Sequence, residues 1–112
     1  MENFEVKITE TALSSLRDIE SFKAQYIGEQ QAKEFAVELL LDSVAKLEEG
    51  ADLYPICARL ADKGVRFHER FTPDGKYSIL YELDGEVAKI LLFTATKQDL
   101  ELLLYRHIIA IE

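Results

Sequence analysis

A stripe of apolar side chains between residues 32 and 47 restricts the folds open to this chain more than any other feature of the sequence. Its members recur every three or four residues, which is the spacing of one face of an α-helix. The stripe therefore predicts an amphipathic helix of about four to five turns that packs on the rest of the protein. Glu48, Glu49 and Gly50 mark the end of this helix. The stripe consists of Ala32, Phe35, Ala36, Leu39, Leu40, Ser43, Val44 and Leu47.

A second helix is predicted directly before this one. Thr9 is placed to cap it, Glu10 puts an acidic side chain in its first turn, where the helix dipole favours one, and Gly28 is placed to end it. The connection at Gly28 is so short that the two helices are expected to be antiparallel neighbours, which makes a helical hairpin. The apolar spacing runs through Ala12, Leu16, Ile19, Phe22 or Lys23, and Tyr26.

Strands are predicted on both sides of the hairpin because apolar and polar residues alternate there. One strand covers residues 4–8, and after the hairpin a loop over 50–63, with room for one helical turn, leads to three more. Asp84 and Gly85 are a strong signal for a tight turn before the last strand, which is apolar on both faces and so belongs inside the sheet. These three strands cover residues 65–70, 77–83 and 87–95, with a turn at 72–75.

The chain ends with a predicted helix from Gln98 to about Arg106, which Thr96 and Asp99 introduce in the manner of a capping box. The order of elements is therefore β-α-α-β-β-β-α. We assign the fold class α+β, with an N-terminal strand, a two-helix hairpin packed on an antiparallel sheet, and a C-terminal helix. No repeat or internal boundary divides residues 1–112, which we expect to form a single domain.

The charge of the chain limits its partners. A formal net charge of −8 opposes broad binding to nucleic acid, because that affinity comes chiefly from clustered Lys and Arg. Cys57 has no second cysteine with which to form a disulfide, and no apolar run approaches the length of a membrane span. We expect a cytoplasmic protein with no membrane contact. The motifs of metal sites, cofactor loops and activated nucleophiles are missing from the sequence, so we expect no metal and no cofactor.

Residues 59–76 carry a net positive charge although the chain as a whole is acidic, with five basic and three acidic side chains. Arg66, His68 and Arg70 alternate along one predicted strand and so project from the same side of it, and Lys76 enters the next strand. Cations beside a titratable imidazole form a patch able to hold a phosphate. The same pattern also fits the polar face of a half-covered sheet, so both interpretations stay open.

A second polar group, consisting of Tyr105, Arg106 and His107, follows the last predicted helix. Its position allows it to add a base or a proton donor at the end of the sheet. The dipole of a helix favours Arg and His at the C-terminal end without any catalytic role, so this group also has a structural explanation.

Four segments of the chain, taken in order, resemble the RelE/ParE family of toxins from toxin–antitoxin systems. They are ITETALSSLRDI near the start, LYP in the loop, KYSILYELDGEVAKILLF across the last hairpin and TKQD at the start of the final helix. The resemblance implies a single RelE/ParE-like toxin domain over residues 1–112, with two helices packed on an antiparallel sheet. It also implies a growth-inhibiting toxin that a cognate antitoxin neutralises.

The resemblance leaves three functions open. Members of the ParE type act on DNA gyrase, and we rank this type first because the TKQD segment is similar to its ending. Members of the RelE type are ribosome-dependent mRNA endoribonucleases, which would make the ribosome and mRNA the partners. The third function is a non-toxic module that only binds the antitoxin. Whether the chain is an enzyme, and whether it forms a homo-oligomer, stays open at this point.

The resemblance also assigns roles to individual residues. If the chain is a ribonuclease, the catalytic candidates are Arg66, His68, Arg70 and Tyr105. Target binding is predicted at Arg66, Arg70, Lys76 and Lys97. The Arg that the ribonucleases carry at the start of the last helix is replaced here by Lys97, Gln98 and Asp99, which favours the ParE type over the RelE type.

Overall fold

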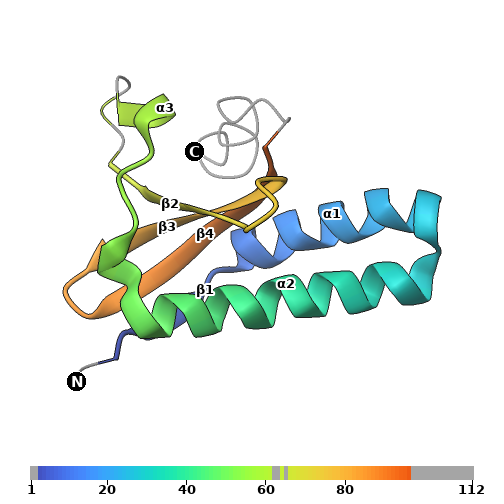
Figure 1. Ribbon diagram of the computed structural model, residues 1–112, viewed down its shortest axis with the longest axis horizontal. Coiled ribbons are helices and arrows are strands. Elements are labelled where there is room, and N and C mark those ends of the chain that lie inside the picture. Colours follow the sequence, from blue (N-terminus) through green and yellow to red (C-terminus); the bar gives the residue numbers. More distant parts are fainter. Residues whose placement is uncertain (1–2, 62–63, 65, 97–112) are drawn as a thin grey trace.

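The strands and the two long helices follow one another in the predicted order, and the computed structural model describes residues 3–61, 64 and 66–96 (Figure 1). The predicted C-terminal helix at 98–106 lies outside the described residues. Within the described part, no helix is both long enough and apolar enough to cross a membrane. The elements are β1 (Glu5–Ile8), α1 (Glu10–Ile27), α2 (Glu29–Gly50), the short 3-10 helix η1 (Ala51–Leu53), α3 (Ala58–Ala61), β2 (His68–Phe71), β3 (Tyr77–Asp84) and β4 (Val87–Ala95).

The helical hairpin forms as the sequence predicts. The hydroxyl of Thr9 accepts a hydrogen bond from the backbone N–H of Ala12 at 3.0 Å, which caps α1. Gly28 has a φ of 88°, a conformation that favours glycine, and it joins the two helices alone. Its N–H donates to the carbonyl of Ala24 and its own carbonyl accepts from the N–H of Ala32, so this one residue pairs with a terminal backbone group of each helix. The two helices lie side by side along the sheet (Figure 1).

The sheet has the strand order β1-β4-β3-β2, and β4 lies inside it as predicted. β2, β3 and β4 are antiparallel neighbours, but β1 pairs with β4 in parallel, so the sheet is mixed rather than wholly antiparallel. The helical hairpin is the reason, because it returns the chain to the end of the sheet where β1 starts, and Phe4 donates a hydrogen bond to the carbonyl of Glu48 there. β2 and β4 therefore both run in the direction of β1.

The main core lies between the helical hairpin and the facing side of the sheet. The register between β3 and β4 shifts after Leu80, which pairs with Leu92, whereas Tyr81 pairs with Ile90. This β-bulge leaves Leu91 as an extra residue and keeps both Ile90 and Phe93 on the helical side. The buried residues of this core are Ala12, Leu16, Ile19, Ala36, Leu39, Leu47, Ala51, Ile79, Tyr81, Ala88, Ile90 and Phe93.

The opposite side of the sheet carries a smaller apolar cluster made of Cys57, Leu60, Leu80 and Leu92. Cys57 is fully buried in this cluster. The segment around it also pairs with the outer edge of β2, since Cys57 donates to the carbonyl of Phe67 and Glu69 donates to that of Pro55. β2 itself begins only at His68, three residues later than predicted.

Candidate functional site

The residues of the predicted basic strand do not form one exposed patch. His68 and Arg70 lie on the same side of β2, as their alternation predicts, and this side faces the helices, with Tyr81 and Ile79 as the paired residues of β3. Arg66 is exposed and precedes the strand, whereas Arg70 is only 4% exposed. Lys76 is exposed in the turn before β3. Lys97 and Tyr105 lie outside the described residues, so their predicted roles stay predictions.

His68 holds the loop after α2 against the sheet. Its Nδ1 lies 2.7 Å from the backbone carbonyl oxygen of Tyr54, and since a carbonyl only accepts, Nδ1 carries the proton and donates it. The imidazole stacks on the ring of Tyr81 with the ring centres 5.3 Å apart. The hydroxyl of Tyr81 in turn donates to the carbonyl of Ala51. These contacts favour a structural role for His68.

Burial raises the pKa of Tyr81 above its ordinary value, and the neighbouring Tyr54 and Asp52 raise it further. The unfolded chain therefore loses this proton first, near pH 10, and the stability that the buried hydroxyl contributes is present below that pH and lost above it. Tyr81→Phe should lower the free energy of unfolding by about 0.5–1.5 kcal/mol at pH 8. The difference in the free energy of unfolding between Tyr81→Phe and the parent should shrink as the pH rises past 10, which urea denaturation at pH 8 and above pH 10 measures. A difference that stays constant would contradict the conclusion that the hydroxyl of Tyr81 is buried in its protonated form.

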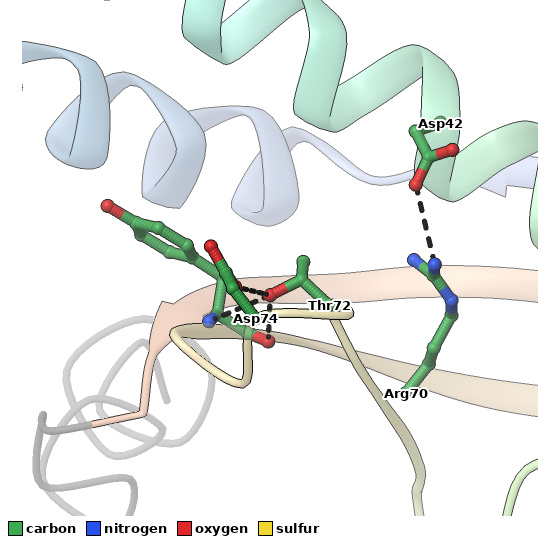
Figure 2. Close-up of polar contacts among 5 residues, drawn as sticks. Asp42, Arg70, Thr72 and Asp74 are labelled. Carbon is green, nitrogen blue, oxygen red and sulfur yellow. Dashed lines mark hydrogen bonds and ion pairs between the residues drawn. The ribbon is translucent and has the colours of Figure 1, made fainter.

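Arg70 is held by an acidic residue of α2. Its Nη2 lies 3.4 Å from Oδ2 of Asp42, and Figure 2 shows the guanidinium reaching from β2 to that helix. The side chain of Arg70 is 5% exposed and that of Asp42 is 51% exposed. The guanidinium also lies 5.9 Å from the centre of the Tyr54 ring. Nη1 is buried and has no hydrogen-bond acceptor within the described part of the chain. The positive charge of Arg70 is therefore paired with Asp42 inside the fold and is not exposed to solvent.

A groove with a volume of about 200 Å³ opens between α2 and the turn that joins β2 to β3. We call it the acidic groove, because three carboxylates line it beside apolar and aromatic side chains. Asp42, which also holds Arg70, is one of the three. The residues that line the groove are Phe35, Glu38, Leu39, Asp42, Thr72, Asp74 and Tyr77.

Hydrogen bonds within the turn fix the carboxylate of Asp74. One carboxylate oxygen accepts from the hydroxyl of Thr72 at 2.7 Å (Figure 2). The same oxygen accepts from the backbone N–H of Lys76 at 3.0 Å. The N–H of Lys76, followed by the hydroxyl of Thr72, lowers the pKa of Asp74 below its ordinary value. Gly75 supplies the left-handed conformation that closes the turn, with a φ of 73°. The groove therefore keeps a negative charge at this position.

The aromatic part of the acidic groove already holds a cation of the same chain. The rings of Phe35 and Tyr77 pack with their centres 5.2 Å apart. Nζ of Lys23, on α1, lies 4.5 Å from the centre of the Phe35 ring and 5.8 Å from that of Tyr77. These distances are within the range of a cation–π interaction. The ring pair is therefore a surface on which an ammonium group rests.

The sequence did not identify the acidic groove as a site. Glu38 and Asp42 are four residues apart and border the apolar stripe of α2, so the sequence places them together beside the buried face. It does not show which turn of the sheet they meet.

Residues 3–61, 64 and 66–96 contain no cluster of three His, Cys, Asp or Glu side chains able to hold a metal ion.

Comparison with known proteins identifies the fold. No family model matches the chain, and no curated protein sequence matches it significantly. Among solved structures, a chain of the chromosomal ParDE TA system from P. aeruginosa superposes with a TM-score of 0.62 over 84% of this chain and 97% of that one, at 21% sequence identity. The chain has a RelE/ParE-like fold. The α+β class assigned from the sequence patterns is thereby confirmed. In this chain the acidic groove lies between α2 and the turn that joins β2 to β3.

Proposed function

We propose that this chain is the toxin of a type II toxin–antitoxin system, a single ParE-like domain that acts in the cytoplasm. It stops growth through DNA gyrase, as toxins of plasmid stabilisation systems do, and a cognate antitoxin protein neutralises it. The observation that carries the proposal is the superposition on the ParDE chain, which extends over nearly the whole of that chain. At this level of identity the superposition concerns the fold, and the four similar sequence segments supply the link to toxins.

The surroundings of the basic strand favour the ParE type over an RNA-cleaving type. A ribonuclease without a metal needs exposed cations to hold the phosphate and a group free to move a proton. Arg70 is buried against Asp42, and Nδ1 of His68 is engaged by a backbone carbonyl. The neighbouring groove is acidic and repels phosphate. Arg66 and Lys76 are the exposed target-binding candidates among the described residues. Arg70, which is buried, and Lys97, which lies outside the described residues, also stay predictions.

Induced expression of the chain alone should stop growth, activate DNA-damage signalling and inhibit supercoiling by gyrase, while ribosome-associated mRNA stays uncleaved. Coexpression of the small gene expected beside it should restore growth, and the two proteins should copurify. Growth curves, a supercoiling assay with purified gyrase and mapping of mRNA ends measure these outcomes. Arg66→Ala, which removes an exposed cation, should weaken the toxicity without loss of folding.

Two outcomes would contradict this proposal. Cleavage of mRNA in the ribosomal A site that Tyr105→Phe abolishes in a folded protein would identify an endoribonuclease of the RelE type. Unchanged growth, together with a stable complex between the two proteins, would identify a non-toxic antitoxin-binding module.

A further inference from the structure

The side of α2 that faces away from the core carries a line of residues that is apolar in its middle and charged at both ends. Its members follow one another at spacings of four, four, three and four residues, which places them along one face of the helix. We call this line the outer stripe. It consists of Lys33, Val37, Leu41, Val44 and Glu48.

The apolar part of the outer stripe is open to solvent. Val37 is 45% exposed and Leu41 is 62% exposed on the next turn, and Val44 is half-buried beyond them. Figure 1 shows α2 along the lower border of the molecule, with α1 and the sheet on one side of it. One exposed apolar residue is common on a protein surface. A line of them on a helix that already buries its opposite face indicates a second contact surface.

The outer stripe is complementary to itself when its direction is reversed. Leu41 lies at its middle, Val37 and Val44 lie about 5 Å to either side along the helix, and Lys33 and Glu48 lie about 11 Å to either side. Two copies of α2 that pack antiparallel therefore bring leucine to leucine and valine to valine. Lys33 of each copy then meets Glu48 of the other, which forms two ion pairs.

The charged ends of the outer stripe are available for these ion pairs. Lys33 and Glu48 are both exposed, and neither side chain forms an ion pair within the described part of the chain. A parallel contact would instead place lysine beside lysine and glutamate beside glutamate, which is unfavourable. The charges therefore select the antiparallel arrangement.

The acidic character of the chain opposes self-association and keeps it weak. Two chains with a formal net charge of −8 repel each other at long range. Glu34, next to Lys33 in the sequence, adds a carboxylate at the rim of the contact, where Gln30 donates a hydrogen bond to it at 3.0 Å. A contact formed mainly by one helix of each copy is also small. We therefore expect association only at high protein concentration.

We propose that the outer stripe is the contact surface for a second copy of this chain, packed antiparallel across a two-fold axis. The two helical hairpins then lie back to back, and both sheets stay on the outside of the pair. The inference does not depend on the proposed function, because it concerns only copies of this chain. An antitoxin helix on the same surface is the alternative that the test excludes or identifies.

Sedimentation velocity of the purified full chain, from about 5 to about 500 µM, measures the association. The chain should change from monomer to dimer over this range. Leu41→Ala should weaken the association at least about tenfold, because it truncates the central residue of the contact in both copies. Leu53→Ala, the same change in a leucine that is 77% exposed and lies outside α2, should leave the association unchanged. Circular dichroism confirms that each variant is folded.

Charge reversal tests the ion pairs. Lys33→Glu and Glu48→Lys should each weaken the association about three- to tenfold, since each replaces two attractive pairs by repulsive ones. The double variant that carries both changes should regain the affinity of the parent. Glu48→Lys is the sharpest of these variants, because it makes the chain less acidic and would strengthen an association governed by net charge alone.

Four outcomes would overturn the inference. They are a chain that stays monomeric at the highest concentration, a dimer that Leu41→Ala does not weaken, a dimer that Glu48→Lys strengthens, and a double variant that associates no better than the single ones. If the chain alone is monomeric and Leu41→Ala instead releases the coexpressed product of the neighbouring gene, the outer stripe binds the antitoxin. The second copy is then excluded, whereas the proposed function stands.

Discussion

Leu47→Ala should lower the free energy of unfolding by about 2–5 kcal/mol, the range measured when a buried leucine is truncated in a packed core. Leu47 is 0% exposed and lies in the last turns of α2, against the core between the hairpin and the sheet. The substitution removes apolar contacts and leaves a cavity that helix and sheet close only in part. Urea denaturation monitored by circular dichroism measures the change.

Leu41→Ala is the matched control, because it makes the same change in the same helix. Leu41 is 62% exposed on the side of α2 that faces away from the core. Its truncation should change the free energy of unfolding by no more than about 0.5 kcal/mol. If the two variants unfold at the same urea concentration, the stripe of α2 is not the buried face, and the packing of the hairpin on the sheet is wrong.

Asp42→Ala should destabilise the protein by about 1–3 kcal/mol, because it leaves the buried guanidinium of Arg70 without its carboxylate. Arg70→Met should cost less, although it removes the larger side chain. It deletes a buried charge together with the Nη1 donor that has no acceptor in the described chain, and it leaves behind a carboxylate that is half exposed and able to hydrate. Thermal melts and urea denaturation of both variants give this order.

Glu38→Ala provides the control, since Glu38 is an exposed carboxylate one turn before Asp42 and should change stability by less than about 0.5 kcal/mol when truncated. Growth inhibition by the folded Arg70→Met variant separates a structural Arg70 from a target-binding one. If Arg70→Met keeps the fold but abolishes growth inhibition, Arg70 contacts the target. If Arg70→Met is the more destabilising of the two, the buried pair contributes more than a hydrophobic replacement does.

Much of the fold follows from local patterns in the sequence. The stripe of α2 and the cap at Thr9 each depend on neighbouring residues, and both are as predicted. The tight turn before β4 also forms, but it consists of Gly85 and Glu86, one residue later than predicted, because Asp84 still pairs with Val87. The parallel pairing of β1 with β4 joins residues more than 80 positions apart, such as Glu5 and Val87, so no local pattern contains it. The start of β2 was predicted three residues early because Val65 to Phe67 continue the alternation, whereas strand pairing begins at His68.

The candidate site was less accessible from the sequence. The alternation of His68 and Arg70 correctly places both on one side of β2, but it does not show that this side faces α2 and its carboxylates. A charged residue on the polar face of a predicted strand is normally expected to be solvated. Asp42 changes that expectation for Arg70, and the contact between them depends on how a helix and a strand 28 residues apart are aligned.

The pairing of β1 with β4 also governs when the protein can complete its fold. During synthesis the helical hairpin leaves the ribosome long before β4 does, so its apolar stripe has no finished sheet to cover until most of the chain has been made. β1 has no partner strand over the same interval, because it pairs with β4, the last strand that the structure describes. Closing a loop of this length slows folding relative to a fold with local pairings. A chain truncated before residue 87 therefore retains the two helices in sequence but lacks the strand that holds both β1 and β3 in place.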